Sequence, residues 1–267
     1  MVSDKESESK ESPKSQKKVF REQLVQGLIE YRSNNTGLLL SAFTAGLEIG
    51  FSLLLMGVLY TDLEPYLPES ILHLFVSLGY PLGFIFVIIG RTQLFTEQTA
   101  QAILPFLNKN IGFSRLIGMW GIVLGGNLLG SLVFSSALIW IGPQMEVMSV
   151  EAFSYFSDKI TQADSLVIFG SAILAGWMMG LLGWLLTTSR ETFSRITIVF
   201  FITTIIGMAK LHHCIVGSVE LFSSLLLGQV TFSETARVLI WSIFGNIVGG
   251  AFFVGIIKFS IIKLSEE

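Results

Sequence analysis

Long apolar runs recur along this chain of 267 residues and decide what it can fold into. A helix of about 20 apolar residues crosses the hydrocarbon core of a bilayer. Five runs reach that length, the last with only Lys258 near its end: Gly37–Tyr60, Ser70–Gly90, Leu116–Gly142, Leu166–Leu186 and Val238–Ile262. A sixth region, Ile196–Gly228, is long enough but is interrupted by a polar motif. With 51% hydrophobic and 14% charged residues, the chain is predicted to be an all-α membrane protein with six transmembrane elements.

The residues before the first run divide into two parts. Residues 1–18 are rich in Ser, Lys and Glu and too poor in apolar residues to fold, which predicts a disordered tail. Residues 19–33 place Phe20, Leu24, Leu28 and Tyr31 at helical spacing, which predicts an amphipathic helix on the bilayer surface or against the spans. A plain extension of the first span is the alternative. We expect residues 34–264 to form a six-span transmembrane channel domain.

Basic residues indicate the orientation, because they collect on the cytoplasmic side of a membrane. They cluster before the first span and in alternate loops, as Lys5, Lys10, Lys14, Lys17, Lys18, Arg21, Arg32, Lys109, Arg115, Arg190, Arg195, Lys258 and Lys263. The other loops are acidic and hold only two cations, Lys159 and Arg237. We therefore expect both termini in the cytoplasm and the protein in a bacterial cytoplasmic membrane.

The chain repeats one motif in its two halves. "GNLLGSLVF" at Gly126–Phe134 returns as "GNIVGGAFFVG" at Gly245–Gly255, each in the third span of its half. Small residues at this spacing let helices approach closely, so either motif alone could serve packing. Together they suggest a duplication. Because a three-span unit contains an odd number of spans, its two copies must enter the membrane in opposite orientations, which predicts an inverted repeat.

The middle span of each half is interrupted by polar residues. "GFIFVIIG" runs into "RTQLFTEQT" in the first half, and "FFITTIIGMA" runs into "KLHHCIVGS" in the second. Broken helices at membrane depth persist only where the freed backbone groups are buried in protein or line a cavity. Paired breaks in corresponding positions are typical of a transport site. The polar clusters are therefore predicted to line a pathway.

The stretch "LGFIFVIIGRTQLFTEQT", the histidine followed by apolar residues, and both Gly-Asn pairs resemble the formate/nitrite transporter family. The resemblance covers about Gly37 to Ile262, and "GRTQLFTEQT" with "GSVELF" is similar to its YfdC-like branch. It implies an aquaporin-like fold, with helices two and five broken, in a homopentamer that has one pore per subunit. It also implies passage of small monovalent anions such as formate, nitrite or hydrosulfide.

By position, the resemblance implies that Thr96 is the threonine of the first break and His213 the central histidine of the pore. It implies hydrophobic constrictions from aromatic and aliphatic residues and a lysine in the outer vestibule, at Tyr80, Phe84, Phe95, Ile206 and Lys159. Three positions depart from the formate-channel pattern and leave the substrate open: Arg91, Lys210 and Gly217.

The chemistry of these residues supports a pore. A lysine at the mouth, Lys159, would concentrate anions, whereas a simple solvated loop charge is the alternative. A buried His213 could relay a proton or hydrogen-bond the substrate, and Thr96 offers a hydroxyl partner. His212 points about 100° away from its neighbour on a helix and is expected to pack or hydrogen-bond between elements. A channel and a proton-coupled carrier for another small solute both fit, as does a protein of this fold that transports no anion.

Other function classes lack their motifs. There is no phosphate-binding loop or Cys pair, because Cys214 is the single cysteine, and no carboxylate lies at ligand spacing from "HHC". We therefore expect no enzyme activity, metal or cofactor. The expected partners are a small anion, membrane lipid and further copies of the chain, but no nucleic acid.

Two charges lie inside the apolar regions without an explanation from the resemblance. Glu48 lies mid-span in "AGLEIGFSLLLMG", and Lys210 lies in the second break. Ionisable residues inside a membrane usually have a partner. We therefore expect Glu48 and Lys210 to form a buried ion pair that braces the loop carrying His213, with Arg91 as the rival partner for Glu48. A pore-facing Lys210 that attracts anions is the alternative.

Overall fold

The structure is a computed structural model that describes residues 14–264, with no account of the side chains at positions 253 and 254. Within residues 14–264 it contains helices and no strand, as expected for an all-α membrane protein. The helices are α2 (Gln16–Arg32), α3 (Asn35–Leu63), α4 (Glu69–Ser77), α5 (Pro81–Gly90), α6 (Phe95–Gln101), α7 (Ile103–Leu107), α8 (Phe113–Gln144), α9 (Val150–Thr161), α10 (Ser165–Thr188), α11 (Thr192–Met208), α12 (Cys214–Leu226), α13 (Phe232–Ile247), the π-helical η1 (Val248–Ile256) and α14 (Ile257–Leu264).

Within the described residues, five helical stretches are long and apolar enough to cross a membrane. They are Asn35–Leu63, Glu69–Gly90, Phe113–Gln144, Ser165–Thr188 and Phe232–Leu264. The remaining apolar region is divided into two shorter helices, α11 and α12. The chain therefore breaks at both places where polar residues interrupt the apolar pattern, after α5 and after α11.

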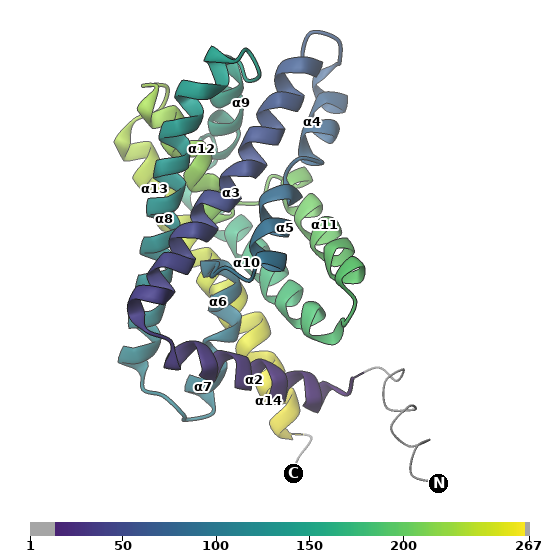
Figure 1. The fold of residues 1–267 in the computed structure, drawn as a ribbon, viewed down its shortest axis with the longest axis vertical. Coiled ribbons are helices and arrows are strands. Elements are labelled where there is room, and N and C mark those ends of the chain that lie inside the picture. Colours follow the sequence, from purple (N-terminus) through teal and green to yellow (C-terminus); the bar gives the residue numbers. More distant parts are fainter. Residues whose placement is uncertain (1–13, 265–267) are drawn as a thin grey trace.

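Glycines of the repeated motif set the closest helix pairs. A methyl group on Gly130 of α8 would overlap the backbone of α3 at Phe43. In the second half, a methyl group on Gly249 of η1 would overlap the backbone of α10 at Ile173. Because only glycine permits this approach, the motif packs α8 on α3 and its copy on α10. Figure 1 shows α3 and α8 running side by side.

The two broken helices run in opposite directions in Figure 1. The chain descends from α4 through α5 to α6, and it ascends from α11 towards α12. The half-helices before the two breaks, α5 and α11, end alike. Arg91 and Lys210, which follow them, both adopt the left-handed conformation, with φ of 59° and 53°. This conformation is uncommon for residues other than glycine and stops the helix at each break.

Helix α2 packs against one end of the bundle, where Figure 1 also shows α7 and α14. It begins at Gln16, three residues earlier than predicted, because the Ser15 hydroxyl accepts a hydrogen bond from the backbone N–H of Lys18 at 3.3 Å. Val19 and Phe20 then pack in one cluster with Leu104, Trp184 and Ile262. Residues 14 and 15, which the prediction assigned to the tail, also make contacts with other described residues. Residues 1–13 of the predicted tail lie outside the described residues.

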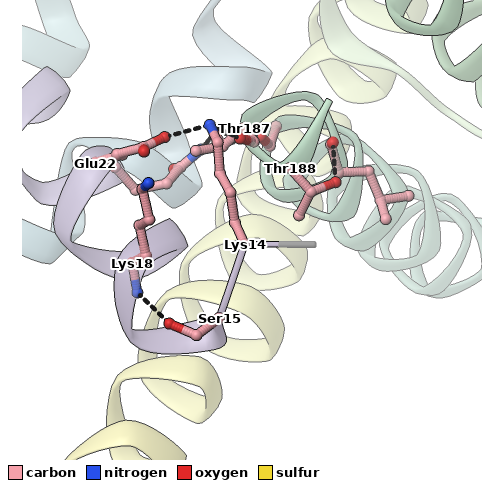
Figure 2. A network of polar contacts seen from close by, with 9 residues as sticks. Lys14, Ser15, Lys18, Glu22, Thr187 and Thr188 are labelled. Atoms are coloured by element: carbon pink, nitrogen blue, oxygen red, sulfur yellow. Dashed lines mark hydrogen bonds and ion pairs between the residues drawn. The ribbon is translucent and has the colours of Figure 1, made fainter. Parts of the chain in front are cut away.

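Polar side chains hold α2 against the end of α10. Lys14 Nζ donates to the backbone carbonyl of Thr187 at 2.7 Å and pairs with Glu22 at 2.6 Å, as Figure 2 shows. The buried Gln23 amide donates to the carbonyl of Gly183 at 2.9 Å and to the Thr187 hydroxyl at 2.5 Å. The buried face of α2 is thus partly polar, which its pattern of apolar residues did not indicate.

Candidate pore and its two cavities

The two broken helices meet at a pair of buried side chains, Thr96 and His213. Thr96 lies in the first turn of α6, and His213 immediately precedes α12. Oγ1 of Thr96 is 2.8 Å from Nε2 of His213, and the two residues are 0% and 3% exposed. Nδ1 of His213 accepts from the backbone N–H of Val216 at 3.3 Å. In the neutral ring the proton is therefore on Nε2, which donates to the Thr96 hydroxyl.

Asn127 of α8 holds the first break in place. Its Oδ1 accepts a hydrogen bond from the backbone N–H of Phe95 at 2.8 Å. Its Nδ2 donates to the carbonyls of Ala42 at 2.7 Å and Gln93 at 2.8 Å. The amide thus satisfies two backbone groups that the break releases and ties them to α3.

Asn246 of α13 does the same for the second break. Its Oδ1 accepts from the backbone N–H of Cys214 at 2.8 Å, and its Nδ2 donates to the carbonyls of Ala172 at 2.8 Å and His212 at 3.0 Å. From the sequence, the two Gly-Asn pairs indicated close packing, a duplication and the family resemblance, but not the role of the amides. The recurrence of a buried amide at the same place in both copies was the available signal.

Aromatic rings stack beside His213. The Phe84 ring, which is fully buried, meets the imidazole edge-on with centroids 5.0 Å apart. Tyr80 stacks on Phe84 at 5.5 Å, and a methyl group on Gly207 would lie 2.9 Å from Cβ of Tyr80. Ile206 is fully buried. The predicted constriction residues Tyr80, Phe84 and Ile206 therefore lie around the two breaks, and so does Phe95, whose backbone Asn127 binds.

A cavity opens on one side of His213, and we call it the His213 cavity. Its walls include Tyr80, Lys159, Ile206, Lys210 and Glu220. His212 bridges α9 and α10. Its Nε2 is 3.0 Å from the carbonyl oxygen of Ile160, and its Nδ1 is 3.0 Å from the Ser171 hydroxyl. This is the linking role that was expected for His212.

Lys159 of α9 lies in the wall of this cavity with its charge partly neutralised. Its Nζ is 3.1 Å from a carboxylate oxygen of Glu69 and 3.4 Å from the centroid of the Tyr155 ring. Burial lowers the pKa of Lys159, and the hydrogen bond and charge of Glu69 oppose that shift. The lysine is therefore part of an ion pair, whereas the expectation treated it as a free vestibule charge.

A second, more polar cavity lies beside the first break, and we call it the Arg91 cavity. Its walls include Glu30 of α2, Arg91, Glu97 and Gln98 near the first break, and Arg195 of α11. Glu97 and Gln98 follow Thr96 directly in the sequence. His213 thus lines one cavity, and the residues directly after its partner Thr96 line the other.

The expected ion pair between Glu48 and Lys210 is wrong. Glu48 accepts a hydrogen bond from the Thr92 hydroxyl at 2.5 Å, beside the first break. Lys210 is exposed and lies in the wall of the His213 cavity. Arg91 lines the other cavity, and among residues 14–264 neither cation forms an ion pair with Glu48. Arg91 and Lys210 thus line different cavities. The hydrogen-bond partner of the Glu48 carboxylate is the neutral hydroxyl of Thr92.

The comparisons with known proteins agree with this architecture. A family model described as "Formate/nitrite transporter" matches residues 17–260. The chain is 32% identical to the inner membrane protein YfdC of Escherichia coli (strain K12) over 243 residues, which cover 88% of this chain and 74% of that protein. It is 23% identical to the nitrite transporter NirC of the same organism over 231 residues, 84% of this chain and 83% of that protein.

Solved structures share the fold. An "FNT family ion channel" superposes with a TM-score of 0.82 at 19% identity, over 91% of this chain and 98% of that chain. A "Pentameric formate channel with formate bound" superposes with a TM-score of 0.72 at 21% identity, over 86% of this chain and 98% of that chain. With broken helices that meet at a buried histidine and a family match over nearly all of its length, this chain belongs to the formate/nitrite transporter family.

Proposed function

We propose that this chain is a membrane channel or transporter that passes small monovalent anions, or their weak acids, and performs no catalysis. The observation that carries the proposal is the buried contact between Thr96 and His213, with His213 in the wall of one cavity and the residues after Thr96 in the wall of another. Formate, nitrite and hydrosulfide are the candidate substrates, because similar proteins carry the first two in their names.

The physical reason is the free-energy penalty for an ion in a dry passage. Moving a bare charge through an apolar constriction costs several kcal/mol even after relaxation. Phe84 and Tyr80 make the surroundings of His213 apolar, so an anion is disfavoured there. An anion of a weak acid avoids this penalty by crossing as the neutral acid, with the hydroxyl of Thr96 and the imidazole of His213 as hydrogen-bonding partners.

Lys210 collects anions in this proposal. It is exposed in the wall of the His213 cavity and forms no ion pair among the described residues, whereas Lys159 is paired with Glu69. A free cation raises the local concentration of anions. Lys159 then shapes the wall of the cavity through its contacts with Glu69 and Tyr155.

The proposed setting is a homopentamer in a bacterial cytoplasmic membrane, with both termini in the cytoplasm and the His213 cavity facing outward. The distribution of basic residues supports this orientation, and the likeness to a pentameric channel supports the assembly. Native mass spectrometry in mild detergent should give five subunits. A monomer would contradict the assembly.

Flux into proteoliposomes tests the function. Formate, nitrite and hydrosulfide should enter faster than into protein-free liposomes, and chloride, whose acid is strong, should enter far more slowly. Runs with and without a pH gradient separate a passive channel from a proton-coupled carrier. If no weak-acid anion enters faster than into protein-free liposomes, the proposal is wrong.

A further inference from the structure

Glu220 is a buried carboxyl group in the wall of the proposed pathway. It follows His213 by seven residues on α12, with Gly217 between them, so all three lie on one face of the helix. All three line the His213 cavity. Glu220 is 7% exposed, and no hydrogen bond or ion pair to it is found in the described part of the chain. A carboxyl group without a partner is unusual at such a position.

Other ionisable side chains face the same cavity from the elements around α12. They are His73 of α4, Tyr80 before α5, Tyr155 and Lys159 of α9, and Lys210, His212, His213 and Cys214 at the second break. The residues that α3 and α13 contribute to the cavity wall are not ionisable, and α8 contributes none. Lys159 is the cation within range of Glu220, but it is already paired with Glu69. The carboxyl group is therefore open to a proton or to a substrate.

The route from Glu220 to His213 is open because position 217 is a glycine. A methyl group added at Gly217 would meet only Cδ1 of Ile160, at 3.8 Å, an ordinary van der Waals contact. Gly217 therefore places no side chain of α12 between the two groups. A small anion in the cavity can touch the carboxyl group before it reaches the imidazole.

We propose that Glu220 is the proton donor of the transport pathway. The O–H bond of its carboxylic acid breaks, the proton forms a new O–H or S–H bond on the weak-acid anion, and the neutral acid passes Thr96 and His213. The carboxylate then takes a proton from a hydronium ion at the cavity mouth, which leaves water. The inference rests on the proposed function and adds a step to it, because the substrate is protonated by the protein before it enters the constriction.

A pH series of formate uptake into proteoliposomes tests the step, with internal pH recorded by a trapped dye. Without a donor, flux should follow the concentration of free formic acid and fall tenfold for each pH unit above the pKa of the acid. The wild-type flux should fall less steeply, and Glu220→Gln should restore the tenfold dependence, with about tenfold lower uptake than wild type near pH 7.5. Glu220→Asp, which keeps the acid, should recover part of the difference.

Glu151→Gln is the matched control, because Glu151 is an exposed glutamate in the first turn of α9. It should leave the profile unchanged. A Glu220→Gln profile identical to wild type would overturn the inference, and so would faster uptake at every pH, which would make the carboxylate only a barrier to anions. Absence of wild-type uptake would instead contradict the proposed function itself. Size-exclusion chromatography of each variant shows that its assembly is intact.

Discussion

Asn127 and Asn246 make the same three kinds of hydrogen bond in the two halves of the molecule. Each Oδ1 accepts from the first backbone N–H of a half-helix, and each Nδ2 donates to one carbonyl of the break and one carbonyl of a neighbouring long helix. Both residues are fully buried. The two side chains therefore hold the breaks that carry Thr96 and His213.

Asn127→Ala and Asn246→Ala should each lower stability markedly. Each leaves one N–H and two carbonyls without their partner, and a buried polar group without a partner costs about 1–3 kcal/mol. We expect a lower apparent Tm in detergent and a lower yield of intact oligomer. Asn110→Ala, at an exposed asparagine in the loop after α7, should change neither. A normal Tm for both buried variants would show that water replaces the amides.

Part of this arrangement could be predicted from the sequence. The breaks were predictable, because charges such as Arg91 and Lys210 interrupt apolar runs that are otherwise long enough to span. The contact between Thr96 and His213 was not, because it joins segments 117 residues apart and depends on how two half-helices meet. The family resemblance supplied the roles of these two residues.

The partner of Glu48 shows why the rest could not be predicted. Position along the helix indicates depth in the membrane but not the direction in which the carboxylate points. The polar group beside the carboxylate is the Thr92 hydroxyl. The prediction chose Lys210 instead, because it assumed that a buried charge is paired with an opposite charge. The start of α2 was also misplaced, because the Ser15 hydroxyl caps the helix and Lys14 contacts Thr187 and Glu22, although these residues look like part of a polar tail.

The contact between Thr96 and His213 should act as a unit in transport. His213→Ala should preserve assembly but change the pH dependence of anion flux, and Thr96→Val should have a similar effect because it leaves Nε2–H without an acceptor. The double variant should then be little worse than either single one, which a double-mutant cycle on flux rates between pH 5 and 8 can measure. Strictly additive effects would mean that the two groups act separately, and unchanged flux in His213→Ala would leave the histidine a packing role.

The Glu30 carboxyl group should make the stability depend on pH. Burial raises its pKa to about 7, although hydrogen bonds from glutamine side chains favour the charged form. The folded state then binds a proton that the unfolded state releases above its ordinary pKa, so the free energy of unfolding falls as pH rises from about 4.5 to about 7. The loss is complete above pH 7 and amounts to roughly 3 kcal/mol at most.

Glu30→Gln should remove this dependence. The apparent Tm of the variant should exceed that of wild type at pH 8, and the two should converge near pH 4.5. Glu191→Gln, at an exposed glutamate before α11, is the control and should follow wild type. Parallel curves for wild type and Glu30→Gln would mean that the cavity water solvates the carboxylate.

Gln23 should decide whether α2 stays against the bundle. Its amide makes two hydrogen bonds to the end of α10, to Gly183 O and Thr187 Oγ1, and it is the buried one of the two side chains that tie α2 to Thr187. Replacing it with alanine removes both hydrogen bonds, each of which contributes about 0.5–1.5 kcal/mol to stability, and most of that loss falls on the docking of one helix. Hydrogen exchange followed by mass spectrometry should show faster exchange over residues 16–32 in Gln23→Ala, while the backbone of α3 and α8 stays protected. Arg21→Ala, at an exposed position of the same helix, should exchange like wild type. If Gln23→Ala exchanges no faster in α2, the apolar contacts of Val19 and Phe20 hold the helix without the amide, and the polar tether contributes little.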